Sequence, residues 1–158
     1  MRRNAAWIGL ILLAIVPAAF AAKAEKGEKG GKPTAKQIDL ANSRATFDTD
    51  DKIDHTNAKK KKVTFIPADI GHLNDEERAK GCILGKIETE RNTEDGLSPG
   101  QYHVYLRREG KKWEIYFCQK GQCVGEAKSI KEGMDNAHKP TFVDAGTRIR
   151  YWELQFSF

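Results

Sequence analysis

The sequence predicts a mainly β protein: a small antiparallel β-sandwich with one short helix, preceded by a disordered N-terminal segment. The first observation is the alternation of apolar and polar residues over 101–118, which is the period of half-buried strands. The second is a similar alternation near the C-terminus, over 148–158. Because about five to seven short strands with little helix must cover their apolar faces, two packed sheets are the expected architecture.

Residues 1–21 have the three parts of a cleavable signal peptide. Two arginines supply the positive start, an uncharged apolar run follows over 5–16, and Ala19 and Ala21 are the small residues that a signal peptidase reads. The run is too short for a transmembrane helix, which needs about 20 apolar residues. We therefore expect an exported chain, periplasmic or secreted and not integral to the membrane, starting at Ala22. An uncleaved anchor is the alternative.

Residues 22–61 read as a flexible charged linker or arm. Residues 22–36 contain no aromatic or β-branched aliphatic residue, so they bury too little apolar surface to offset the entropy of ordering. Their lysines alternate with glutamates, which favours a solvated spacer over an anchor to anionic lipid or polysaccharide. From residue 37 onward the apolar residues are isolated, and we expect at most one strand or a loosely packed arm.

The charge balance argues against a nucleic-acid partner. The whole chain carries a net charge of +5; without Arg2 and Arg3 it has 25 basic and 22 acidic residues, or +3. This excess is mild, and export would separate the protein from nucleic acid.

The folded domain is expected over 62–158, and its first elements follow from local signals. Residues 63–66 predict a strand. Asn74 and Glu77 form a capping box that starts a short helix, and a glycine in a left-handed conformation ends it at position 81. Residues 82–90 predict the next strand.

The best-determined part is the meander over 101–130. A two-residue turn at Glu109-Gly110 puts six apolar side chains on one face, which selects an even register. The predicted pairs are Leu106 with Trp113, Val104 with Ile115, and Tyr102 with Phe117. A second turn, at Lys120-Gly121, sets Cys118 opposite Cys123, and a bulge near Gly125 restores the phase.

The three cysteines of an exported chain raise the question of disulfides. The register places Cys118 and Cys123 face to face, which favours a bond between them. Reduced thiols, or a bond from either cysteine to Cys82, are the alternatives. The apolar flanks of Cys82 predict a buried, inert thiol rather than an intermolecular disulfide.

The C-terminal third is less regular. Residues 129–139 predict a weak helix, opened by Ser129 and Glu132 and kept short by a glycine and a proline. Residues 148–158 predict one final strand. Within it Ile149 and Tyr151 are out of phase with the later apolar residues, which indicates a bulge.

The residues Leu97-Ser98-Pro99-Gly100-Gln101-Tyr102-His103-Val104 resemble a turn of the transthyretin-like and carboxypeptidase regulatory-like β-sandwich domains. The matching motif there is Leu-Pro-Pro-Gly-x-Tyr-x-Val, a tight turn that feeds a strand whose tyrosine packs in the core. The resemblance covers about twenty residues and implies a sandwich with a binding or accessory role. It implies no active site.

Motifs that would hold a metal ion or carry catalysis are incomplete or absent in the sequence. Structural zinc sites usually show two short-spaced ligand pairs, and the chain offers one, Cys118 and Cys123. A calcium loop starting at Asp48 would need ligands or a glycine where Lys52, Ile53 and Lys59 stand. No serine-nucleophile, phosphate-loop or zinc-protease motif is present. The sequence therefore predicts no metal, no cofactor and no catalytic residue.

The second face of the meander is the remaining candidate site. His103, Tyr105 and Tyr116 share it, and an aromatic, mixed-polar sheet face can hold a sugar ring or a peptide edge. The alternative is that these rings are cross-strand pairs or lie beneath another layer. The predicted function is a non-catalytic exported module, binding or structural, whose partner is an envelope polysaccharide or protein. A small secreted hydrolase with a site built from loops is the alternative.

Overall fold

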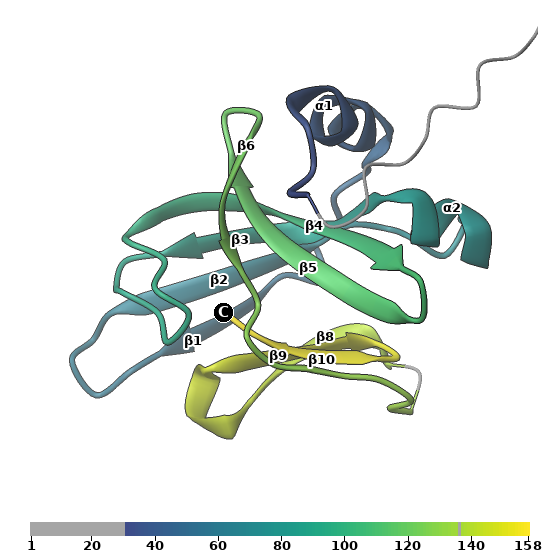
Figure 1. Ribbon diagram of the computed structural model, residues 1–158. Helices are drawn as coiled ribbons and strands as arrows, with labels where there is room; N and C mark the ends of the chain where they lie inside the picture. Colours follow the sequence, from purple (N-terminus) through teal and green to yellow (C-terminus); the bar gives the residue numbers. More distant parts are fainter. Residues whose placement is uncertain (1–30, 136) are drawn as a thin grey trace, which may run out of the picture.

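Two antiparallel β-sheets pack face to face in a computed structural model that describes residues 31–135 and 137–158 (Figure 1). The predicted signal peptide, and the predicted disordered segment up to residue 30, lie outside the described residues. The mainly β antiparallel sandwich is confirmed, although the described residues form ten short strands where five to seven were expected.

The larger sheet holds six strands in chain order, each antiparallel to the next. They are β1 (Ile53–Thr56), β2 (Lys62–Pro67), β3 (Cys82–Thr89), β4 (Gly100–Glu109), β5 (Lys112–Gln119) and β6 (Gln122–Glu126).

The smaller sheet holds four strands in the order β7-β10-β9-β8 and forms the lower layer of Figure 1. They are β7 (Ile130–Lys131), β8 (Ala137–Val143), β9 (Arg148–Trp152) and β10 (Leu154–Ser157). A 3-10 turn, η1 (Asp144–Gly146), joins β8 to β9.

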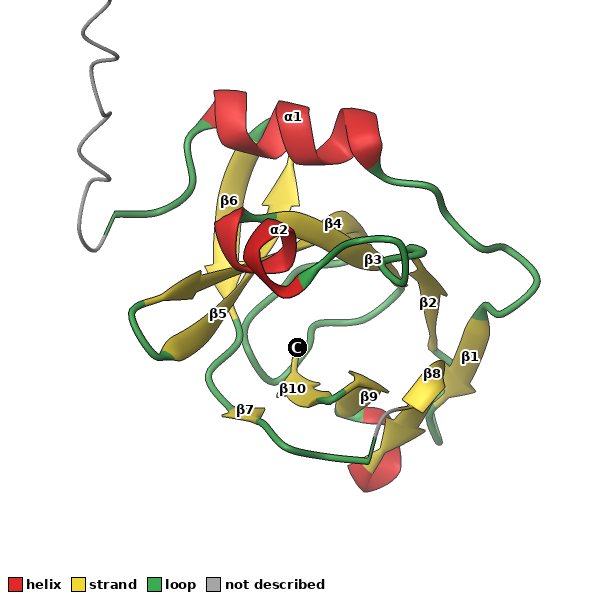
Figure 2. Ribbon diagram, turned by 90° about the vertical axis from the view of Figure 1, so that its right-hand side faces the viewer, coloured by secondary structure: helices red, strands yellow, loops and turns green. Residues whose placement is uncertain are grey.

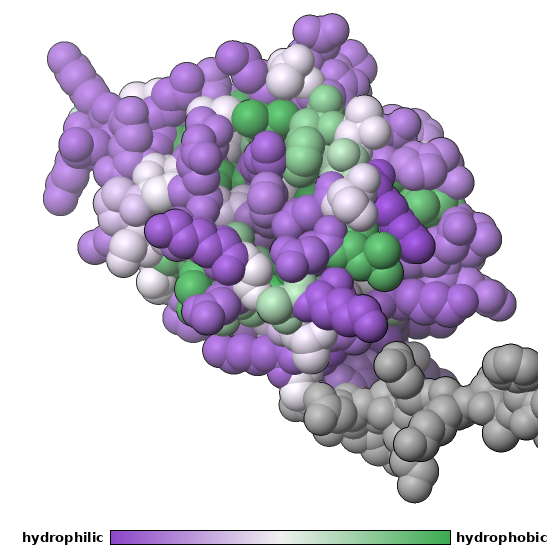
Figure 3. Space-filling model, turned by 90° about the horizontal axis from the view of Figure 1, so that it is seen from above, coloured by the Kyte–Doolittle hydropathy of each residue, from purple (hydrophilic) through white to green (hydrophobic). Residues whose placement is uncertain are grey.

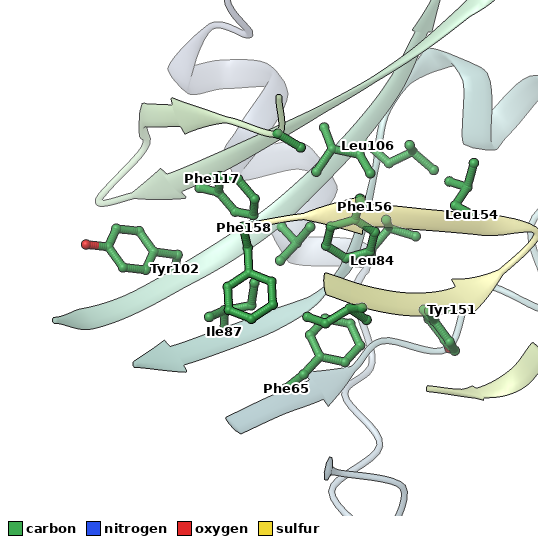
Figure 4. Close-up of a cluster of buried hydrophobic side chains, with 14 of the residues drawn as sticks. Phe65, Leu84, Ile87, Tyr102, Leu106, Phe117, Tyr151, Leu154, Phe156 and Phe158 are labelled. Carbon is green, nitrogen blue, oxygen red and sulfur yellow. The ribbon is translucent and has the colours of Figure 1, made fainter. Parts of the chain in front are cut away.

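The main core lies between the two sheets (Figure 4). Phe156 and Phe158, from β10 and the residue after it, are 0% and 1% exposed and lie against the inner face of the larger sheet. Phe65 makes edge-on ring contacts with Tyr151 and Phe156, at centroid distances of 5.9 and 6.4 Å. Each such side chain contributes about 1.5–3 kcal/mol through removal of apolar surface from water, so this layer dominates stability.

The predicted short helix is confirmed as α2 (Asp75–Lys80). Its capping box is complete: the Asn74 side chain accepts from the Glu77 backbone N–H at 2.9 Å, and the Glu77 carboxylate accepts from the Asn74 N–H at 2.8 Å. Gly81 ends the helix with a φ of 134°, a value that favours glycine.

The prediction of a flexible linker over 22–61 is wrong from Ala35 onward, although the one strand expected there is present. Helix α1 (Ala35–Arg44) and strand β1 both lie within this range, so the folded unit begins well before residue 62. Thr34 and Gln37 form a capping box, and Ile38 and Ala41 face inward from the helix. A few apolar residues on one face were enough to dock this polar segment, because the sheet offers it an apolar surface.

The predicted register of β4 and β5 is wrong by two residues, although the predicted faces are confirmed. Leu106 pairs with Ile115 and Val104 with Phe117, and the inner face remains apolar. The turn is formed by Gly110 and Lys111, not by Glu109 and Gly110. Gly110 has a φ of 59°, and a hairpin turn that requires positive φ at its first central residue selects glycine there.

The predicted hairpin between β5 and β6 is confirmed. Lys120 and Gly121 form the turn, both with positive φ, and Cys118 pairs with Cys123. The predicted bulge is also present, because the register shifts so that Phe117 pairs with Gly125.

Two predictions near the C-terminus are wrong. The phase break within 148–158 is a chain reversal rather than a bulge: Tyr151 pairs with Leu154, so β9 and β10 form a hairpin that turns at Trp152 and Glu153. The residues that the structure describes in the segment 129–139 form no helix. It contributes β7 and the start of β8, because the edges of the smaller sheet offer it backbone partners.

Candidate functional site

The predicted ligand face of His103, Tyr105 and Tyr116 is mostly covered. Tyr105 and Tyr116 are 1% and 5% exposed and pack with Ile38 and Ala41 of α1 in a second apolar cluster. Figure 2 shows α1 lying across the outer side of the larger sheet. The two tyrosines pair with each other across β4 and β5, whereas His103 pairs with Cys118. These pairs follow from the two-residue shift of the β4–β5 register described above.

His103 is the member of this set that borders open space. It lines a groove of about 300 Å³ on the larger sheet, built from β3, β4, β5 and the turn after β5. The groove is lined by Lys86, Gln101, Tyr102, His103, Cys118, Gln119 and Lys120. Sequence reasoning missed the lysines and glutamines, although the alternation in β3 and β4 puts Lys86 and Gln101 on the face of His103.

Phe47, in the segment between α1 and β1, contacts two groups of the groove. Its ring stacks on the His103 imidazole, with centroids 5.9 Å apart and planes 18° from parallel. The Lys86 ammonium lies 4.0 Å from the centroid of the same ring. Burial, reinforced by the positive charge of Lys86, lowers the pKa of His103. The imidazole is therefore neutral near pH 7 and able to accept a proton or a hydrogen bond.

Side-chain amides continue the polar lining. The Gln101 amide donates to the Glu88 carboxylate at 2.7 Å, and the Gln119 amide donates to the Gln101 backbone carbonyl at 2.8 Å. Figure 3 views the side of the molecule that carries α1, where the surface is mainly hydrophilic with separate hydrophobic areas. The groove therefore presents hydrogen-bonding groups, and the Phe47 ring packs against its imidazole and one of its ammonium groups.

A second polar cluster fixes the opposite end of this face. The Arg107 guanidinium pairs with the Glu114 carboxylate at 2.8 Å and also donates to the Gly31 backbone carbonyl. The Tyr116 hydroxyl donates to Glu114 at 2.9 Å. Burial, followed by this hydrogen bond to an anion, raises the pKa of Tyr116 to about 12. These contacts tie the chain before α1 to the sheet, which is a structural role.

The predicted disulfide between Cys118 and Cys123 is present, and Cys82 is a free, buried cysteine. Cys118 is 1% exposed and Cys123 is partly exposed. Cys82 is 5% exposed in the core between the sheets, where burial raises the pKa of its thiol to about 12. A thiol in this state is a poor nucleophile and a poor metal ligand.

Within residues 31–135 and 137–158, no group of three histidine, cysteine or acidic side chains is arranged to hold a metal ion. The acidic turn after Phe47 is a local hydrogen-bonded loop, in which the Asp48 carboxylate accepts from the backbone of Asp50 and Asp51. In the same described ranges, no helix is long and apolar enough to cross a membrane. Among the groove-lining side chains there is no carboxylate.

Comparison with protein-family models, curated proteins and solved structures returned no match. The resemblance of residues 97–104 to transthyretin-like domains stays a prediction. Tyr102 at this turn is 5% exposed, and its hydroxyl donates to the Ser98 carbonyl at 2.7 Å. The tyrosine that follows the turn therefore stabilises the turn through this hydrogen bond.

Proposed function

We propose that this protein is an exported, non-catalytic β-sandwich module that binds a polysaccharide of the cell envelope in the groove beside His103. The observation that carries the proposal is the lining of the groove. It combines amides, an imidazole and two ammonium groups, and the ring of Phe47 stacks on that imidazole. Sugars are recognised by such sets, because their hydroxyls need hydrogen-bond partners and their ring faces pack on aromatic groups.

Export is supported by two features. The N-terminal sequence has the parts of a signal peptide. The Cys118–Cys123 disulfide is the kind of bond that persists in oxidising compartments. The intact mass of the exported protein should match a chain that starts at Ala22. Recovery of the full-length species with the membranes would contradict this part of the proposal.

The experiment on binding is co-sedimentation of the mature chain with insoluble cell-wall and polysaccharide fractions. Lys86→Met should lower the affinity about tenfold or more, since a hydrogen bond to a charged group contributes about 1.5–3 kcal/mol. Lys139→Met is the matched control, because Lys139 lies on β8 of the other sheet with its side chain 80% exposed.

Three outcomes would contradict the proposal. Failure to bind any fraction would indicate a structural role. Equal binding by the wild type and Lys86→Met would place the site elsewhere. Binding that is abolished by protease treatment of the fraction would identify a protein partner instead.

A further inference from the structure

The charged side chains that line the groove are all positive. Lys86 and Lys120 are the two charged residues of the lining, and the remaining lining residues carry no acidic group. Lys86 lies on β3 and Lys120 follows β5, so the two lysines stand on opposite sides of β4. Neighbouring strands of a sheet lie about 4.8 Å apart. A ligand that crosses these strands therefore passes both ammonium groups.

Neither groove lysine has a carboxylate partner within the protein. Among the residues that the structure describes, no ion pair includes Lys86 or Lys120. Lysines outside the groove do form such pairs: the Lys139 ammonium lies 2.9 Å from the Asp51 carboxylate. The positive charge of the groove is therefore not compensated by direct contact.

Two carboxylates lie near the rim of the groove. Glu88 accepts a hydrogen bond from the Gln101 amide at 2.7 Å, and Asp39 of α1 lies beside Gly121, the residue after Lys120. Neither carboxylate is within ion-pair distance of a groove lysine. Because the interaction between charges weakens with distance, these groups reduce the positive potential of the groove without removing it.

The Lys86 side chain is held in place before any ligand binds. It is half-buried, and its ammonium lies 4.0 Å from the centroid of the Phe47 ring, which also stacks on His103. A side chain that is already ordered loses less conformational entropy on binding. The groove therefore offers a fixed cation beside a neutral imidazole and amides that can meet hydroxyl groups.

We infer that the groove takes an acidic polysaccharide, whose carboxylate or phosphate groups pair with the ammonium groups of Lys86 and Lys120. This inference rests on the proposed function and names its substrate class. An ammonium is a compact charge without the rigid fork of donors that a guanidinium has, so it suits either kind of anion. A neutral polysaccharide would displace water from Lys86 without supplying a negative charge, which disfavours its binding.

The test uses the cell-wall and polysaccharide fractions that bind the mature protein, before and after their anionic groups are removed. Carboxylates are converted to methylamides with carbodiimide and methylamine, and phosphates are released with hydrofluoric acid. At least one treatment should lower the affinity about tenfold or more, because the charged partner of Lys86 is lost. The treatment that does so identifies the anion.

Substitutions in the protein connect this effect to the groove. Lys86→Met should lower the affinity for the untreated fraction about tenfold or more, and Lys120→Met, at an exposed residue, about two- to fivefold. On the treated fraction both variants should bind like the wild type, because the anion that each lysine contacted is gone. Lys139→Met, on the other sheet, should bind both fractions like the wild type.

Three results would contradict the reasoning at different points. Equal binding of the wild type to untreated and fully treated fractions would overturn the inference and leave the proposed function standing. Losses in the lysine variants that persist on the treated fraction would also overturn it. Failure to bind any untreated fraction would contradict the proposed function itself, and this inference with it. The chemical treatment acts on the polymer, so the first comparison holds even if a variant fails to fold.

Discussion

Replacement of Ile38 by alanine tests whether α1 belongs to the fold. Ile38 lies on the inward face of α1, is 0% exposed, and packs in the cluster that contains Tyr105 and Tyr116. Removing a fully buried isoleucine down to alanine costs about 2–5 kcal/mol. Because α1 lies at the edge of the fold, it can move to fill part of the cavity that the substitution leaves. We therefore expect a destabilisation in the lower part of this range, about 2–3 kcal/mol.

Leu40 provides a matched control in the same helix. Its side chain is 51% exposed, so Leu40→Ala should change the free energy of unfolding by no more than about 0.5 kcal/mol. Both substitutions end in alanine, and the helix propensities of isoleucine and leucine differ by only a few tenths of a kcal/mol, so propensity contributes little to the difference between the variants.

The assay is urea unfolding of the mature chain, followed by tryptophan fluorescence. With a slope of about 1–3 kcal/mol per molar urea, Ile38→Ala should lower the midpoint by about 0.7–3 M without changing the slope. If Ile38→Ala unfolds within about 0.5 kcal/mol of Leu40→Ala, α1 does not stabilise the fold, and the reasoning is refuted.

Two further predictions concern the larger sheet. Gly85→Ala should destabilise the protein by about 3 kcal/mol or prevent folding. The new Cβ would lie 2.5 Å from the Ile66 carbonyl oxygen and 2.6 Å from the Phe65 ring. Gly31→Ala is the control, because a Cβ there meets nothing within 4 Å, and equal stabilities of the two variants in thermal unfolding would contradict the prediction. For Tyr116 the folded pKa of about 12 exceeds the ordinary 10.0, so its contribution is complete below pH 10 and is lost as the pH rises towards 12. Tyr116→Phe should flatten the fall in unfolding free energy over this window, and an unchanged slope would show that the hydroxyl does not titrate there.

Local patterns predicted much of the larger sheet. The alternation around Val104 and Ile115 identified the inner face, and the turn at Lys120-Gly121 identified the partner of Cys118. Both depend on residues close in sequence, where strand period and turn chemistry leave few alternatives. The capping box of α2 was readable for the same reason.

The covering of the sheet was not predictable in the same way. Nothing in the strand pattern says that the face of Tyr105 is occupied by a polar-looking segment about seventy residues earlier in the chain. A capping box at Thr34 and Gln37, followed by Ile38 and Ala41, was the available signal. The polar composition of the surrounding segment led instead to the prediction of a flexible linker. An average over the segment does not show that two of its apolar residues lie on one helix face.

The hairpin of β9 and β10 was missed because a phase change has two physical causes. A bulge and a chain reversal both shift the apolar positions by one residue. Trp152, at the reversal, has a φ of 53°, which bulky residues seldom adopt, so propensity argued against a turn there. The chain nevertheless reverses there, because the hairpin lets both Tyr151 and Leu154 pack in the core.

The central claim is that the groove beside His103 is the binding site. The most direct measurement is a titration of ¹⁵N-labelled mature protein with soluble fragments of envelope polysaccharide, followed by backbone amide shifts. Saturable shifts that cluster at Lys86, Gln101, His103 and Gln119 are the expected result. Shifts confined to the outer face of the smaller sheet, or no shifts with any fraction, would contradict it.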